Sequence, residues 1–128
     1  MTIATVKRLG RTHPVSVLGR LLGLADYISW AALAAGMEEE PPCRDISENM
    51  LTGYLPAVPG TLVQLRRAVE HSIDYAPAKV RTNLHDVLNE VLRDLTECDL
   101  HAMMNSDPLR NPDLILVVEA QKKALMGS

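Results

Sequence analysis

The chain has almost no aromatic side chains: its 128 residues include one Trp, three Tyr and no Phe, 3% in all. Hydrophobic residues nevertheless make up 47% of the chain, so a core must be built from Leu, Val, Ala, Ile and Met. Strands are enriched in aromatic and β-branched residues, whereas Leu, Ala and Met favour helix. The composition therefore predicts an all-α protein, and a chain of this length forms a single domain.

Cysteine is also scarce, and the chain has no excess of positive charge. The two cysteines, Cys43 and Cys98, are too few for the disulfide framework of a small secreted domain, so we expect both to be reduced thiols. The formal net charge is −3. Proteins that bind phosphate backbones usually carry an excess of Lys and Arg, so nucleic acid is disfavoured as the main partner.

No uncharged run is long enough to span a membrane. The most apolar stretch, residues 17–36, follows a basic start and contains Ala-Leu-Ala, which resembles a signal-peptide cleavage site. Arg20 and Asp26 interrupt this stretch, whereas a spanning helix needs about 20 consecutive apolar residues. We therefore expect a cytoplasmic protein with no membrane contact.

Catalytic and cofactor motifs are absent from the sequence as well. It has neither a Gly-rich phosphate loop nor a G-x-S-x-G element. Residues 70–74 contain the letters of a hydrolytic triad, but neighbouring side chains on a helix do not face one another. Asp94, Cys98 and His101 have the spacing of one helix face and could hold zinc, although the simpler interpretation is a core Cys98 between two solvated side chains. We expect no enzyme, no cofactor and no metal.

A long heptad-like pattern is the strongest positive feature. From about residue 78 to residue 104, apolar positions recur in steps of four and three, which predicts one amphipathic helix. The stripe consists of Leu84, Leu88, Val91, Leu95, Cys98 and Ala102. Such a helix would be about 40 Å long, whereas a compact chain of this size is only about 36 Å across. Either the bundle is elongated, or the helix end packs on another molecule.

Four further helices, one of them short, complete the predicted bundle of about five. Proline, glycine and capping residues place them at about 14–35, 47–52, 61–75 and 113–126. In the first of these, Gly19 and Gly23 lie four residues apart, where another backbone could approach closely. Residues 1–12 show no helical pattern and read as a flexible basic arm, which leaves one helical domain at 13–128.

The start of the last predicted helix is apolar on every side. A strand competes for this β-branched run, but the capping pattern of Asn111 and Pro112 favours helix. A helix that is apolar all round needs covering on more than one face. Together with the long helix, this predicts a homodimer. Its interface residues are expected to be Leu114, Ile115, Val117 and Val118.

Two of the four aromatic residues, Tyr27 and Trp30, lie on one side of the first long helix. An exposed aromatic pair is a typical anchor of a protein interface; the alternative is that Trp30 closes the end of the bundle. Bacterial antiactivators are often helical proteins of this size and acidity. The likeness concerns fold class, size and charge, and no sequence motif supports it. We therefore expect a small regulatory protein that binds another protein, for example at the dimerisation surface of a transcription regulator.

The alternative function is a DNA-binding regulator. Residues 61–83 read as a helix, a turn at Pro77 and a second helix that begins with Lys79 and Arg81, where a recognition helix contacts bases. The second helix becomes acidic after Asn83, and the field of the whole molecule repels DNA. The sequence therefore favours a protein partner.

Overall fold

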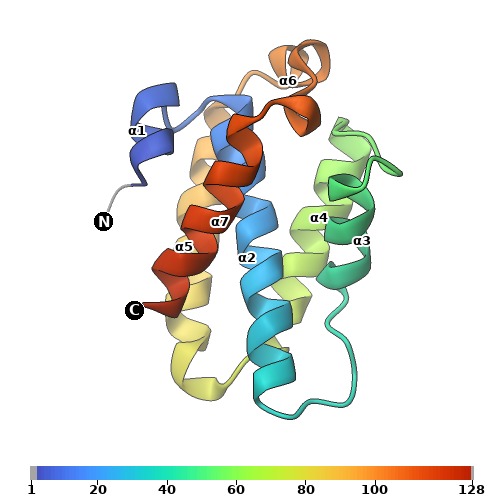
Figure 1. The fold of residues 1–128 in the computed structure, drawn as a ribbon, viewed down its shortest axis with the longest axis vertical. Coiled ribbons are helices and arrows are strands. Elements are labelled where there is room, and N and C mark those ends of the chain that lie inside the picture. Colours follow the sequence, from blue (N-terminus) through green and yellow to red (C-terminus); the bar gives the residue numbers. More distant parts are fainter. Residues whose placement is uncertain (1–2, 128) are drawn as a thin grey trace.

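In the computed structural model, which describes residues 3–127, the chain is all-helical (Figure 1). This confirms the predicted fold class. Within the described residues there are seven α-helices instead of about five, because one short helix near the N-terminus was not expected and the predicted long helix is divided into two. The elements are α1 (Ala4–Leu9), α2 (Pro14–Ala34), α3 (Cys43–Leu51), α4 (Pro59–Ser72), α5 (Ala78–Glu97), α6 (Leu100–Ser106) and α7 (Asp113–Met126), with 3-10 turns at Ile73–Tyr75 and Pro108–Arg110.

Helix α2 forms the centre of the molecule. Sixteen of its 21 residues are buried, and the other helices surround it, with α5 and α7 on one side and α3 and α4 on the other (Figure 1). Arg20 and Asp26 are its only charged residues, so the helix is apolar around its circumference, as is typical of a buried helix. The helix that needs covering on every face is therefore α2, not α7.

By length and composition alone, α2 could cross a membrane. In its most apolar window, however, 72% is buried inside the fold. The surrounding helices supply the apolar environment that lipid would otherwise provide, which is consistent with the core helix of a soluble protein.

Helix α7 runs parallel to α2 and packs against it at two glycines. A Cβ atom built on Gly19 would lie 2.6 Å from the Cβ of Val117, and one built on Gly23 would lie 2.7 Å from the Cβ of Gln121. Real Cβ atoms do not approach so closely, so the two helices touch here only because both side chains are absent. The close approach expected at these glycines is confirmed, with α7 as the partner.

Helix α5 carries the predicted apolar stripe but is shorter than expected. Leu88 and Val91 are buried as predicted, and Leu84 is buried as well. Leu95, which was also expected to be buried, is only partly so. The helix has 20 residues and ends at Glu97, after which Cys98 is extended, with ψ 139°. At about 30 Å, α5 is no longer than the bundle, so its length does not argue for a second subunit.

The side chain of Asp99 explains this break. Its Oδ1 accepts hydrogen bonds from the amides of His101 at 3.0 Å and Ala102 at 3.2 Å. An aspartate that satisfies two free N–H groups stabilises a helix start. The chain therefore starts α6 at Leu100 instead of extending α5.

The other predicted helix ends lie within a few residues of those observed. After α2, the expected stop at Gly36 is confirmed: its φ is +79°, and the following amide of Met37 donates to the carbonyl of Ala32 at 3.0 Å, as in a Schellman end. Before α7, Oδ1 of Asn111 accepts from the amide of Asp113 at 2.9 Å. Local capping signals thus locate these ends well.

Part of the predicted flexible arm is a helix. Residues 4–9 form α1, which packs on α2 and α7 and buries Val6. Arg8 forms an ion pair with Asp113 at 2.8 Å, at the start of α7. The described part of the arm is therefore held against the bundle.

Candidate functional site

A buried ion pair joins α2 to α5. Nη1 of Arg20 lies 2.8 Å from Oδ2 of Asp94, and the two side chains are only 6% and 9% exposed. Nε of Arg20 also donates to the carbonyl of Ser16 at 3.0 Å. A buried charge is tolerated only when it is paired and hydrogen-bonded, and this arrangement meets both conditions.

The linker between α1 and α2 extends this pair into a cluster of four charges. Arg11 pairs with Glu90 and places its Nε 3.3 Å from Asp94, while its carbonyl accepts a 2.5 Å hydrogen bond from Nη2 of Arg20. Two guanidinium groups and two carboxylates leave no net charge. We refer to Arg11, Arg20, Glu90 and Asp94 as the ion cluster.

This cluster was not expected from the sequence, and the prediction that Asp94 lies in solvent is wrong, since its side chain is only 9% exposed. The available signal was Arg20 in the middle of a helix that is otherwise apolar. An arginine there requires a buried carboxylate, but spacing along the chain does not identify which carboxylate supplies it.

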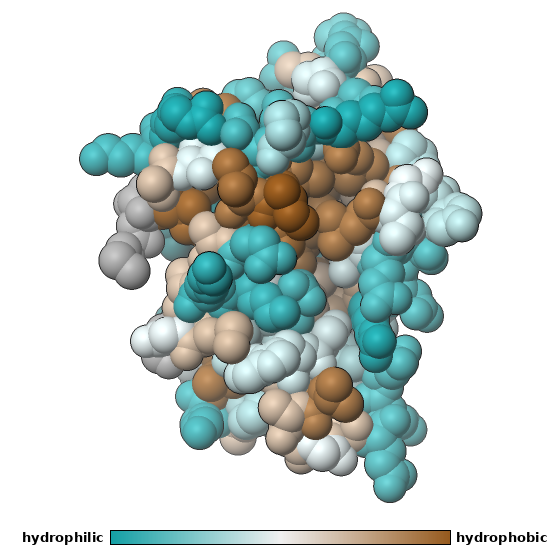
Figure 2. Space-filling model, in the orientation of Figure 1, coloured by the Kyte–Doolittle hydropathy of each residue, from teal (hydrophilic) through white to brown (hydrophobic). Residues whose placement is uncertain are grey.

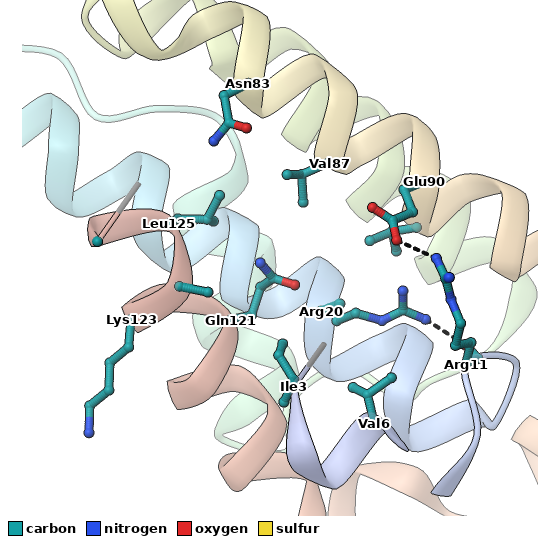
Figure 3. A pocket seen from close by; sticks show the side chains of 13 residues that line it. Ile3, Val6, Arg11, Arg20, Asn83, Val87, Glu90, Gln121, Lys123 and Leu125 are labelled. Atoms are coloured by element: carbon teal, nitrogen blue, oxygen red, sulfur yellow. Dashed lines mark hydrogen bonds and ion pairs between the residues drawn. The ribbon is translucent and has the colours of Figure 1, made fainter. Parts of the chain in front are cut away.

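A cavity of about 440 Å³ opens beside the ion cluster, between α1, α2, α5 and α7 (Figure 3). Its apolar lining includes Val87 from α5 and Leu125 from α7. The amide of Gln121 points into it, whereas Lys123 extends away at the rim (Figure 3). The cavity thus has one polar wall and one apolar wall.

The predicted partner residues lie at the C-terminal end of α2, where the helix emerges from the core. Trp30 is 42% exposed and Leu33, one helical turn later, 72% exposed. Met37, whose backbone is bonded to the last turn of α2, is also exposed. We call Trp30, Leu33 and Met37 the α2 stripe. Sequence reasoning missed Leu33 and Met37, although Leu33 has the spacing of a same-face neighbour of Trp30.

Tyr27 occupies a different place from the one predicted. It is only 5% exposed, so it does not offer a surface to a partner. Its ring lies under Trp30, with the centroids 5.8 Å apart and the planes tilted by 42°. Tyr27 therefore supports the indole of Trp30 from inside the fold.

The predicted dimer residues are divided between core and surface. Leu114, Val117 and Val118 are buried against the glycine face of α2 in the same chain, so they are not available to a second subunit. Ile115 is 50% exposed, as is Leu116 at 53%. Figure 2 shows apolar surface over the upper part of α7. Of the four predicted dimer residues, Ile115 is therefore the one that is exposed enough to contact a second subunit.

The zinc alternative loses its shared helix face. Cys98 ends α5, whereas His101 belongs to α6 and is exposed. Among residues 3–127, no group of three or more His, Cys, Asp or Glu side chains is arranged around a possible metal ion. Burial raises the pKa of the Cys98 thiol and also that of the Cys43 thiol, so each loses its proton less readily than a free thiol.

Ser72, the hydroxyl of the apparent triad, has a structural role. It is buried, its Oγ donates to the carbonyl of Ala68 at 2.5 Å, and it accepts from the amide of Cys43 at 3.0 Å. His71, the neighbouring residue on α4, is exposed. Ser72 thus joins α3 to α4 and is closed off from solvent.

The DNA-binding alternative depended on the start of α5. There the guanidinium of Arg81 donates to the carbonyls of Ala76 and Asp74, each at 2.9 Å. These bonds hold Arg81 back against the preceding turn. A recognition helix needs side chains that extend outward into a groove, so Arg81 is poorly placed for base contacts.

Comparison of the chain with protein-family models, with curated proteins and with solved structures finds no match.

Proposed function

We propose that this chain is a small regulatory protein that acts by binding another protein through the α2 stripe. The observation that supports this most directly is the exposure of Leu33, 72%, beside a half-exposed Trp30. Interface energy concentrates in a few aromatic and large apolar anchors. The stripe offers such anchors at the end of the best-packed helix.

The setting of Trp30 favours recognition because its position is fixed before binding. Tyr27 packs beneath it, and α2 is held on all sides by the other helices. A side chain that is already ordered loses little conformational entropy when a partner covers it. The stripe is therefore better suited to docking than an equally apolar residue on a loop.

The charges beside the stripe indicate the chemistry of the partner. Glu38 and Glu39 follow Met37 directly and are exposed, while Glu40 pairs with Arg44 at 2.8 Å. An apolar centre with an acidic rim fits an apolar pocket with basic residues around it. Rim charges of this kind mainly raise the association rate.

Within this proposal, the partner is a larger regulator, for example a transcription regulator whose dimerisation surface the stripe occupies, and the protein acts as an antiactivator in a bacterial cytoplasm. The small size and the acidity of the chain support this proposal only because antiactivators often share these two properties. The chain carries the binding surface, and the regulated activity belongs to the partner.

Self-association is the second part of the proposal. Ile115 and Leu116 place two large apolar side chains next to each other on the outer face of α7, and a second copy of the chain would cover them. This face is distinct from the α2 stripe, so a dimer would present two stripes and bind a symmetric partner at two points.

Differential capture from the source cell tests the proposed partner surface. The wild-type protein, Leu33→Glu and the control Tyr54→Glu are immobilised in parallel, and retained proteins are compared by mass spectrometry. Tyr54 is 82% exposed and lies just beyond α3, so its substitution changes an exposed apolar residue elsewhere. A partner retained by wild type and by Tyr54→Glu but lost with Leu33→Glu supports the proposal.

Two results would contradict it. One is a set of retained proteins that Leu33→Glu leaves unchanged. The other is retardation of a random DNA duplex at low salt with steep loss at higher salt, which would favour the DNA-binding alternative instead.

A further inference from the structure

Gln121 is a largely buried side chain whose amide takes no part in the packing of α7 on α2. It lies on α7 directly over Gly23 of α2 and is 7% exposed. Among residues 3–127, the structure records no hydrogen bond for its side-chain amide. Among the described residues, Oγ of Ser16 is the one fully buried side-chain polar atom without a partner, so the amide of Gln121 is still reached by solvent. It can therefore bind a polar group that replaces water.

The amide has room for such a group. Figure 3 shows it directed into the cavity, between Arg20 and Leu125. The cavity volume of about 440 Å³ lies within the range of small-molecule sites, roughly 300–1,000 Å³. A ligand that enters it could reach the amide and contact Val87 and Leu125 at the same time.

The charges around the cavity define what kind of ligand fits. Arg11 and Arg20 are balanced by Glu90 and Asp94, so an ion brought into the cavity would be desolvated without an opposite charge left to meet it. The guanidinium of Arg20 has five N–H donors, and three hydrogen bonds are recorded for it among the described residues. Neutral hydrogen-bonding groups are therefore favoured.

We propose that the cavity between α1, α2, α5 and α7 binds an uncharged small molecule with an amide-like polar group and a short branched aliphatic body. The polar group pairs with the amide of Gln121, which supplies both a donor and an acceptor, and with a remaining N–H of Arg20. The aliphatic body lies against Val87 and Leu125. This site is separate from the α2 stripe, so it does not depend on the proposed partner.

The test uses 3-methylbutanamide as the probe and the full-length protein labelled with ¹⁵N. Titration followed by two-dimensional NMR should give saturable shifts of the Gln121 side-chain NH₂ and of the Val87 and Leu125 amides. For a molecule this small, the expected Kd is on the order of 1 mM. The carboxylate of the same carbon skeleton, 3-methylbutanoate, should bind at least about tenfold more weakly because it is charged.

Three variants separate the site from general effects. Gln121→Leu should weaken binding about fivefold or more, the effect expected from losing one hydrogen bond. Val87 is half-buried on the apolar wall, and Val87→Phe should weaken binding by filling the cavity. This variant replaces Gln121→Leu in the test if Gln121→Leu does not fold. Gln64→Leu, the same change at an exposed position on α4, should leave the titration unchanged.

The proposal is overturned if the amide gives no saturable shift at Gln121 up to tens of millimolar. It is equally overturned if the carboxylate binds as tightly as the amide, or if folded Gln121→Leu and Val87→Phe both bind like wild type.

Discussion

Val117 of α7 occupies the space that a side chain at Gly19 of α2 would need: a Cβ atom built there would lie 2.6 Å from both Cβ and Cγ1 of Val117. One turn later, Gly23 meets Gln121 in the same way. The two parallel helices are therefore held at a separation set by two absent side chains. This contact positions α7, and with it both the cavity and the outer face that carries Ile115.

Gly19→Ala should destabilise the protein by about 1–3 kcal/mol, because the added methyl must displace Val117 and its backbone. The measurement is urea unfolding followed by circular dichroism. Gly60→Ala is the matched control, since Gly60 lies in the first turn of α4 and nothing stands within 4 Å of a Cβ built there. The control should be neutral or more stable by about 0.5 kcal/mol. Equal effects of the two substitutions would contradict the close contact of α2 with α7.

Asp94→Asn should lower the free energy of unfolding by about 3–5 kcal/mol. The substitution keeps the shape of the side chain but leaves Arg20 charged in the core without its counter-ion. The comparison is Glu48→Gln, which removes an exposed partner of Arg44 at 3.0 Å and should leave the free energy of unfolding almost unchanged, because solvent screens exposed ion pairs. Similar unfolding midpoints for Asp94→Asn and wild type would show that the ion cluster is not buried in solution.

Stability should fall above about pH 9 because of Cys43. Burial raises the pKa of this thiol above its ordinary value of 9.0, so in alkaline solution the unfolded chain loses the proton before the folded chain does. The stabilising contribution is complete below pH 9 and is lost as pH rises toward the folded-state pKa. Urea titrations at pH 7.5 and pH 10 should show a smaller decrease for Cys43→Ala than for wild type. An identical decrease in both proteins would rule out Cys43 as the cause.

The wild-type protein should sediment as a dimer in analytical ultracentrifugation at tens of micromolar. Ile115→Glu should convert it to a monomer, because a charge would then have to be desolvated in the interface. Val63→Glu, at a similarly exposed apolar residue on α4, should leave the dimer unchanged. A wild-type protein that is a clean monomer at this concentration would exclude the proposed self-association.

Features governed by neighbouring residues could be predicted from the sequence, whereas those set by tertiary contacts largely could not. The low aromatic content predicted the all-α class, and Gly36 and Asn111 marked helix ends because their effects act within one turn. Asp99 is also a local capping residue, but the apolar repeat that runs through residues 78–104 led to the prediction of one continuous helix there. Local signals of this kind compete, and only the packed structure shows which one prevails.

The candidate sites depend on tertiary contacts, which the sequence does not reveal. An apolar run at the start of α7 indicates burial but does not say whether a second subunit or α2 provides it. In the same way, Arg20 required a buried carboxylate, and Asp94 lies 74 residues away along the chain. Trp30 could be chosen as a surface anchor because aromatic residues are few, while the burial of Tyr27 depended on how α2 is enclosed.

The affinity of the captured partner for Trp30→Ala tests the central claim most directly. Isothermal titration calorimetry should show binding weakened by about 2 kcal/mol, roughly thirtyfold in Kd, because a preordered anchor is lost. The triple substitution of Glu38, Glu39 and Glu40 by Gln should change Kd much less, and added salt should have only a small effect. The opposite pattern, unchanged affinity for Trp30→Ala together with loss of binding in the glutamate triple variant, would contradict docking through the α2 stripe.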